Sequence, residues 1–85
     1  MPELPVVVGE LGEYLYTRTG NKSPFAKLVN ERINKIPQRV EHSAVASSTG
    51  LKHKGDELHF DADSEREFGR RYAAAMLRLR ASKNR

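Results

Sequence analysis

One polar segment of the sequence, Lys54–Asp61, holds residue types that general acid–base chemistry needs. Asp56 and His59 stand three residues apart in it, so a loop that folds back can bring the carboxylate to Nδ1 of the imidazole. That contact would fix the tautomer of the ring and leave Nε2 facing outward as a general base. We therefore treat His59 as a candidate base and Asp56 as the acid that orients it.

Other interpretations of these residues compete with that one. Spacing alone favours a simpler prediction, in which Asp56 and His59 order a turn and Asp61 caps the following helix. A metal site built from the same residues and His53 lacks the tight ligand spacing of metal-binding motifs. The run that begins at Asp61 starts like a calcium loop, but it lacks the Gly and the final Glu that such a loop requires. We expect neither a metal nor another cofactor.

The loop that carries the Asp–His pair must be positioned by a sheet. Residues 4–9 form a β-branched run without polar alternation, which predicts a strand covered on both faces, as in parallel α/β sheets. A glycine-containing loop is predicted over 10–22, and a shorter strand over 43–48. The loop over 50–61 then follows the carboxyl end of the second strand, where open α/β sheets place their sites.

The first of two predicted helices covers residues 24–36. Ser23 is expected to cap it, and Pro24 fits the first helical position, where its missing N–H costs nothing. Apolar residues follow helical spacing until Pro37 ends the pattern. This helix can serve as the right-handed crossover between two parallel strands.

The second helix is predicted over 63–81. Asp61, Asp63 and Ser64 all offer caps for it, and Ser64 with Glu67 has the S-x-x-E spacing of a capping box. Gly69 is expected to let the helix approach its neighbour closely. The apolar residues predicted for its buried stripe are Phe68, Tyr72, Ala75, Met76 and Leu79.

Composition limits the class of protein. The chain has 85 residues and no cysteine, so it forms one small domain at most and has no disulfide framework. No apolar run approaches the roughly 18 residues of a membrane span, and no basic region of a signal peptide precedes residues 4–9. We expect no membrane association, and we exclude a large enzyme and a disulfide-stabilised secreted domain.

Positive charge gathers at the carboxyl end. Residues 65–85 carry seven Lys or Arg and two Glu, whereas the first 64 residues carry eight basic and nine acidic ones. A basic helix can bind nucleic acid, but no aromatic stacking platform flanks Arg70 and Arg71, so we do not expect that partner. His42 and His53 have no partner that the sequence indicates, and both are expected at the surface.

The order strand, helix, strand, helix leaves the sheet incomplete. Two strands do not form an independently stable sheet, and the strand over 4–9 needs neighbours that residues 1–85 do not contain. We therefore expect a single partial domain that either associates with another chain, including a second copy, or belongs to the end of something larger.

The sequence around the Asp–His pair resembles a known enzyme family, the sialate O-acetylesterases and acetylxylan esterases of the SGNH (GDSL-like) hydrolases. Upstream, residues 4–12 resemble the penultimate strand of that family, and 29–37 and 47–51 resemble the helix and final strand that follow. The similarity covers nearly the whole chain in order. The residues that resemble its closing block are Lys54–Asp61, Ser64, Arg66-Glu67, Gly69-Arg70-Arg71 and Tyr72-Ala73.

The resemblance implies a flavodoxin-like three-layer fold, of which this chain would be the carboxyl-terminal β-α-β-α portion. It also implies a Ser-His-Asp triad that removes acetyl groups from carbohydrates, with His59 as the catalytic base and Asp56 as its orienting acid. The nucleophile serine and the oxyanion-hole residues of the family belong to upstream blocks that residues 1–85 do not contain. We therefore expect a carboxyl-terminal esterase fragment that is inactive alone and lacks its amino-terminal half.

For the chain to act alone, one of its own serines would have to replace that nucleophile. None stands in a G-x-S-x-G elbow or a GDS-like context. The alternative function is a non-catalytic module that binds a partner chain through its open sheet edge, or nucleic acid through its basic last helix. The serines that qualify by residue type are Ser23, Ser43, Ser47, Ser48, Ser64 and Ser82.

Overall fold

Strands and helices alternate along the chain, of which a computed structural model describes residues 4–83. The strands are β1 (Val6–Gly9) and β2 (Ser43–Ala46), and the helices are α1 (Ala26–Ile33) and α2 (Ala62–Lys83). The two strands pair in parallel, with the start of β1 opposite the start of β2. This arrangement confirms the predicted α/β class and its β-α-β-α order, and it is compatible with part of a larger α/β fold.

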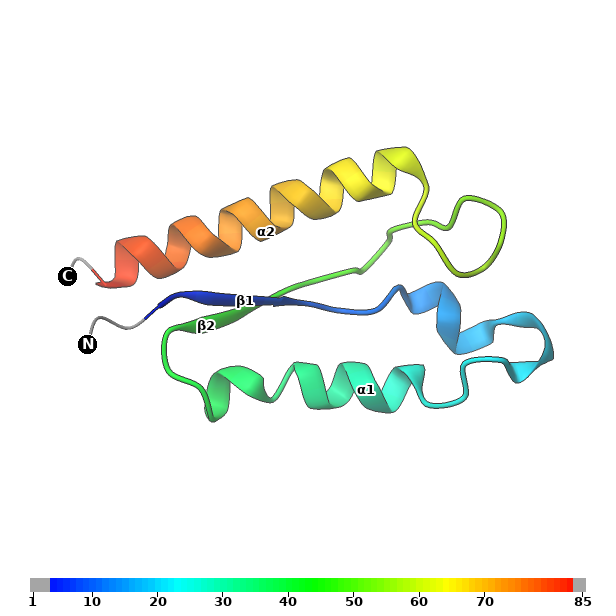
Figure 1. The fold of residues 1–85 in the computed structure, drawn as a ribbon, viewed down its shortest axis with the longest axis horizontal. Helices are drawn as coiled ribbons and strands as arrows, with labels where there is room; N and C mark the ends of the chain where they lie inside the picture. The colour runs from blue at the N-terminus through cyan, green and yellow to red at the C-terminus, as the bar shows by residue number, and fades with distance from the viewer. Residues whose placement is uncertain (1–3, 84–85) are drawn as a thin grey trace.

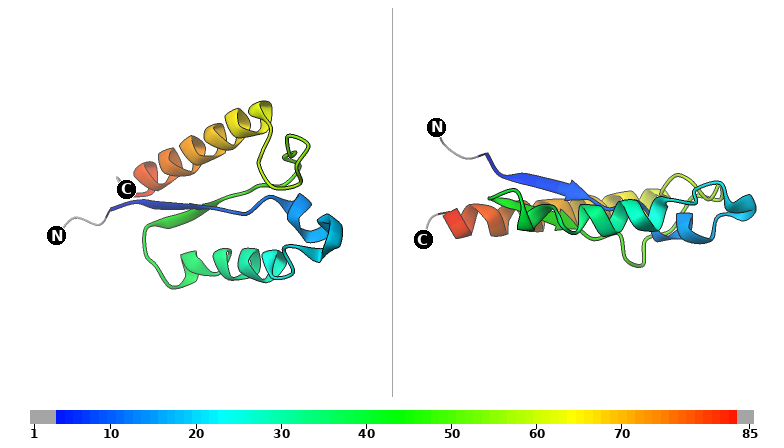
Figure 2. Two further views of the ribbon diagram at one scale, coloured as in Figure 1. Left: turned by 45° about the vertical axis from the view of Figure 1, so that its right-hand side comes forward. Right: turned by 90° about the horizontal axis from the view of Figure 1, so that it is seen from below.

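The two helices lie on opposite sides of the strand pair (Figure 1), and the other views agree (Figure 2). α2 contacts both strands, and α1 packs against the 3-10 helix η1 (Glu13–Thr17) that follows β1. The segment after β1 and the loop after β2 lie at the same end of the molecule, beyond the carboxyl ends of both strands (Figure 1). The topology therefore gathers these two segments where parallel sheets carry their sites.

α1 begins later and ends earlier than the predicted range 24–36. The side chain of Ser23 does not cap it; instead the Ser23 carbonyl accepts the N–H of Ala26 at 3.2 Å. Pro24 lies in the turn before the helix, so the cap prediction placed the helix start two residues too early. After α1 the chain turns into the 3-10 helix η3 (Ile36–Gln38), whose second residue is the proline that ends the apolar pattern.

α2 is capped by Asp61 and not by the predicted capping box. Asp61 Oδ1 accepts the N–H of Ser64 at 2.7 Å, and its carbonyl accepts the N–H of Glu65 at 2.9 Å. Ser64 therefore lies inside the first turn, and Glu67 turns away to bind Arg71. Asp61 is one of the three caps that the sequence offered, and only the capping box of Ser64 and Glu67 was wrong, because Asp61 takes the N-cap position three residues earlier.

The core is thin. Ala75 on the inner face of α2 is fully buried, and Ala46 at the end of β2 is 2% exposed. The Phe68 ring of α2 packs against Phe60 and Tyr72, with centroid distances of 5.1 and 5.0 Å. Small residues are thus buried on both the helix and the sheet, and aromatic rings extend the packing toward the loop after β2.

The close approach between α2 and its neighbours lies at Gly9, in β1. A Cβ on Gly9 would stand 2.7 Å from Cζ of Tyr72 and 2.9 Å from Cζ of Phe68. Gly69, predicted to make this approach, is exposed, and no atom lies within 4 Å of the position that a Cβ on it would take. The glycine that the packing requires is therefore in the strand, because the aromatic side chains come from the helix.

Candidate active site

The Asp–His pair lies in a closed loop after β2. His53 and Phe60 form an antiparallel bridge at its base. The Lys54 N–H donates to the His59 carbonyl, and the Asp61 N–H donates to the carbonyl of residue 52, each at 2.9 Å. The loop is thus closed by backbone hydrogen bonds directly before the first turn of α2.

Asp56 and His59 meet inside this loop. Oδ2 of Asp56 lies 2.6 Å from Nδ1 of His59. The other carboxylate oxygen, Oδ1, accepts the N–H groups of Leu58 at 3.0 Å and of His59 at 2.9 Å. The hydrogen bond from the imidazole and these backbone bonds hold the pKa of Asp56 far below its ordinary value. The carboxylate therefore stays charged wherever the imidazole can act as a base.

This geometry has a direct chemical consequence. With Nδ1–H donated to a carboxylate, the neutral imidazole keeps its lone pair on Nε2. The His59 side chain is 64% exposed and Nε2 has no hydrogen-bond partner within residues 4–83. The arrangement can accept a proton from a hydroxyl group that approaches from outside, and the nearby carboxylate would stabilise the imidazolium that results.

The same contacts also order a turn. Asp56 Oδ1 binds the amides two and three residues ahead, which is the geometry of an Asx turn. The turn and the oriented imidazole thus depend on different oxygens of one carboxylate. The two interpretations that the spacing left open are therefore compatible in this loop.

Comparison with known protein families gives a match over most of the chain. The family model described as "Carbohydrate esterase, sialic acid-specific acetylesterase" matches residues 1–78. The chain belongs to this carbohydrate esterase family. A search of curated proteins finds no match. The family resemblance expected from the residues around Asp56 and His59 is thereby confirmed.

In this esterase-family chain, residues of η1 and of the segment that follows it hydrogen bond to the loop with the Asp–His pair. The Tyr14 hydroxyl donates to the Leu58 carbonyl at 2.9 Å, and its ring packs edge-on against Phe60. The Thr19 hydroxyl donates to the carboxylate of Glu57 at 2.9 Å. Neither anchor could be predicted from the sequence, because nothing in residues 10–22 indicates that they fold against a loop some 40 residues later.

His53 is not the unpartnered surface residue that was predicted. Its Nδ1 accepts the N–H of Gly55 at 3.0 Å and that of Glu57 at 3.1 Å. Its ring lies edge-on to Tyr14, at a centroid distance of 5.3 Å. His42 was also misplaced, because its Nε2 lies 2.9 Å from the carbonyl of Leu79 in α2 and its Nδ1 is buried.

The start of α2 is joined to the loop by two side chains. Ser64 Oγ accepts the N–H of Lys52 at 2.8 Å, while Asp61 caps the helix. The N–H and hydroxyl of Ser64 lower the pKa of Asp61 by hydrogen bonding to its charged form. Helix and loop therefore share one hydrogen-bonded junction, which fixes the start of α2 against the base of the Asp–His loop.

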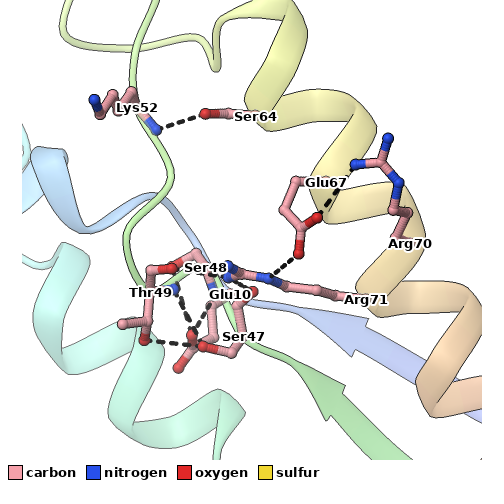
Figure 3. Close-up of polar contacts among 9 residues, drawn as sticks. All are labelled: Glu10, Ser47, Ser48, Thr49, Lys52, Ser64, Glu67, Arg70 and Arg71. Carbon is pink, nitrogen blue, oxygen red and sulfur yellow. Dashed lines mark hydrogen bonds and ion pairs between the residues drawn. The ribbon is translucent and has the colours of Figure 1, made fainter.

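The carboxyl ends of the strands are tied together by charged side chains (Figure 3). Glu10 after β1 accepts the N–H of Ser48 after β2 at 2.7 Å. Burial raises the pKa of Glu10, but hydrogen bonds from Asn34 and Ser48 outweigh it and leave the pKa below its ordinary value. Arg71 reaches from α2 and donates to two carbonyls of the turn after β2, each at 2.9 Å. These contacts fix the carboxyl ends of the two strands and α2 relative to one another, directly before the Asp–His loop begins.

Four serines of the esterase-family chain form side-chain hydrogen bonds to groups other than His59. Ser43 and Ser48 donate to backbone carbonyls at 2.6 and 2.7 Å, and Ser47 donates to a threonine hydroxyl at 2.9 Å. Ser64 is bound at the helix junction, and the side chain of Ser82 lies outside the described part of the structure. Across residues 4–81, no hydrogen bond joins a serine to the imidazole of His59.

Within residues 4–83, no three His, Asp or Glu side chains gather as ligands for a metal ion. No helix of the described residues combines the length and apolarity that a membrane crossing requires. A groove of about 620 Å³ runs beside α1, and its lining includes neither Asp56 nor His59. The Asp–His loop therefore remains the candidate site.

Proposed function

We propose that this chain supplies the base of a carbohydrate O-acetylesterase, with His59 as the catalytic base and Asp56 as the acid that orients it. The observation that carries the proposal is the 2.6 Å contact between Asp56 Oδ2 and His59 Nδ1, in a chain that belongs to a carbohydrate esterase family. The exposed Nε2 edge is where a reacting hydroxyl would approach. The substrate class is an acetylated carbohydrate.

The chemistry is an acyl transfer in two steps. His59 Nε2 takes the proton of a serine hydroxyl as its oxygen attacks the acetyl carbonyl, and the imidazolium then gives this proton to the departing sugar oxygen. A water molecule next loses a proton to Nε2 while its oxygen attacks the acyl-enzyme. The imidazolium returns that proton to the serine oxygen, and acetate leaves. In both steps Asp56 stabilises the imidazolium.

We infer that the serine and the oxyanion donors come from polypeptide other than these 85 residues. Four of the described serines form side-chain hydrogen bonds to other groups, and the sequence holds no G-x-S-x-G elbow. A base without a nucleophile and oxyanion donors has little to act on. The missing parts would be another stretch of the same polypeptide or a separately encoded chain.

The proposal is tested by measuring acetate release from O-acetylated sialic acid and acetylated xylan. The isolated 85-residue chain is expected to release none above buffer. An antibody against residues 66–80 would then isolate the native product that contains this sequence, and that product is expected to release acetate. Acetate release by the isolated chain that disappears in His59→Ala would contradict the inference that the nucleophile lies elsewhere. A native product inactive on every acetylated carbohydrate would contradict the function.

A second candidate function is a binding module for a partner chain, and the open edge of β1 favours it. Within the described residues β1 pairs with β2 alone, and the neighbouring side chains of Leu4 and Val6 are 75% and 41% exposed. An open strand edge of this kind can accept another strand. Sedimentation velocity of the isolated chain tests it, since concentration-dependent dimers would indicate self-association through this edge.

The nucleic-acid version of this alternative has less support. Arg71 donates to two backbone carbonyls and to Glu67, and Arg70 also pairs with Glu67. These side chains are committed to contacts within the chain, so the basic helix offers fewer free cations than its composition indicated. Binding to single-stranded DNA that weakens steeply with salt would reverse this judgement.

A further inference from the structure

Four backbone N–H groups of the Asp–His loop are bound by only two side chains. Asp56 binds the last two of them, as described above. His53 binds the other two, because its Nδ1 accepts the N–H of Gly55 at 3.0 Å and that of Glu57 at 3.1 Å. Asp56 stands between these two residues. His53 therefore fixes the backbone on both sides of the carboxylate that orients His59.

Of the two residues whose amides His53 binds, Glu57 is in an unfavourable backbone conformation, whereas glycine adopts a positive φ readily. Gly55 has φ 118° and Glu57 has φ 60°. A residue other than glycine rarely adopts a positive φ, and it does so only where surrounding contacts hold its backbone. The Glu57 amide bonded to His53 and the Glu57 carboxylate bonded to Thr19 are the contacts that do so here. Loss of the His53 contacts would let the chain on either side of Asp56 relax.

The contacts of His53 also specify its protonation. An imidazole nitrogen that accepts two N–H groups carries no proton, so the ring is neutral with its proton on Nε2. A proton added to Nδ1 would face both amide hydrogens, and both hydrogen bonds would be lost. The carboxylates favour that proton electrostatically, whereas the two amides oppose it. The titratable and charged groups around the ring are Tyr14, Glu57 and Asp61, with Lys52 beside Asp61 and Arg18 beside Glu57.

We propose that His53 is a positioning residue for the Asp56–His59 pair and that it acts only while its imidazole is neutral. A proton on His53 Nδ1 would break the two hydrogen bonds that flank Asp56 and release the loop. The inference rests on the proposed function for its catalytic meaning. The conformational part concerns this loop alone and is measured without any esterase activity.

The test is nuclear magnetic resonance of the 85-residue chain labelled with ¹⁵N. Long-range ¹H–¹⁵N spectra report which ring nitrogen of His53 carries the proton, and we expect Nε2 at neutral pH. As the pH falls, the amide signals of Gly55 and Glu57 should move with the same midpoint as the ring of His53. The Ala75 amide in the buried face of α2 should not follow that midpoint. A proton on Nδ1 at neutral pH, or amides that do not follow the ring, would overturn the proposal.

Matched variants separate His53 from the other groups that titrate nearby. His53→Asn keeps an acceptor near the position of Nδ1 but does not titrate, so the two amides should stay protected and lose their pH step. His53→Ala removes the acceptor, and amide exchange at Gly55 and Glu57 should become about tenfold faster, as expected for loss of one ordinary hydrogen bond. His59→Asn removes the second imidazole and should leave the step in place. A step that persists in His53→Asn would assign it to another group and refute the role of His53.

A catalytic readout then distinguishes the two proposals. In the native product that releases acetate, the acid limb of the kcat/KM profile should combine protonation of the base with protonation of His53. His53→Asn should therefore make that limb less steep, which a residue with a merely structural role would not do. An unchanged acid limb contradicts the role of His53 while leaving the base proposal intact. Activity that does not depend on His59 contradicts the base proposal. The tautomer and amide measurements test the role of His53 independently of that result.

Discussion

The side chain of Tyr72 in α2 occupies the space beside Gly9 in β1 that a Cβ would need. Its Cζ lies 2.7 Å from that position, and Cζ of Phe68 lies 2.9 Å from it. No side chain at residue 9 can be accommodated unless two aromatic rings of the helix move. The aromatic rings of α2 can therefore pack against β1 only because residue 9 has no side chain. This contact lies directly before the segment that anchors the Asp–His loop.

Gly9→Ala is expected to destabilise the chain by about 1–3 kcal/mol, the usual cost of overpacking a well-packed contact. Gly69→Ala is the matched control, because that helical glycine has open space around its Cβ position. The control should be stabilised by roughly 0.5–1 kcal/mol, since Ala is the better helix former. Urea unfolding followed by circular dichroism measures both. Equal effects of the two substitutions would show that α2 does not pack on β1 in this way.

Arg71→Ala tests the contact between α2 and the turn after β2. Loss of two hydrogen bonds from a charged group to carbonyls should cost about 1.5–3 kcal/mol. Arg70→Ala changes the same residue type at the adjacent position, where the side chain is 70% exposed and bonds only to Glu67. That control should be close to neutral, as exposed ion pairs usually are. Equivalent melting curves for the two variants would contradict the role assigned to Arg71.

Asp61→Ala should lower the melting temperature, because it removes the cap of α2, whereas Asp63→Ala two residues later should change it less. Asp61→Asn should retain the cap, since Asn accepts the same N–H bond. The pKa of Asp61 is lowered in the folded chain. Its contribution is therefore complete above the ordinary Asp value of about 3.9 and is lost as the pH falls through the lower folded value. Asp61→Asn should remove that part of the acid dependence, and a wild-type acid profile in this variant would exclude Asp61 as its source.

Tyr14→Phe should loosen the Asp–His loop without unfolding the chain. The variant keeps the ring contact with Phe60 but loses the hydrogen bond to the Leu58 carbonyl, which is worth about 0.5–1.5 kcal/mol. Amide exchange at Leu58 and His59 should accelerate, while exchange in α2 should be unchanged. Tyr16→Phe is the matched control, because the Tyr16 hydroxyl bonds to Asn30 and not to the loop. Equal acceleration in both variants would mean that Tyr14 does not anchor the loop specifically.

The sequence was informative where the contacts are local. Asp56 and His59 meet as their spacing predicted, because a turn of three residues brings a carboxylate and an imidazole together with little help from the rest of the chain. The β-branched run and the helical periodicities likewise predicted the order of the elements. The sequence left the cap of α2 open, because Asp61 and Ser64 both fit an N-cap, and only the folded structure shows that Asp61 is the one used.

The supports of the loop could not be predicted in this way. Tyr14 and Thr19 contact residues 44 and 38 positions further along the chain, and no local pattern encodes such a contact. His53 looked unpartnered because its partners are backbone amides, which the sequence does not distinguish. The sequence alone does not distinguish Gly9 from Gly69. Only the position of the Tyr72 ring in the structure shows that residue 9 is the one that must be a glycine.

The central claim, that His59 is a base oriented by Asp56, is tested most directly by substitution in the native acetate-releasing product. His59→Ala and Asp56→Asn should each lower kcat by at least about 10³-fold, the order found when the base or the orienting acid of a triad is removed. Arg70→Ala should leave kcat unchanged, which controls for expression and folding. Retention of more than a tenth of the wild-type kcat in His59→Ala would contradict the account, because then another group accepts the proton.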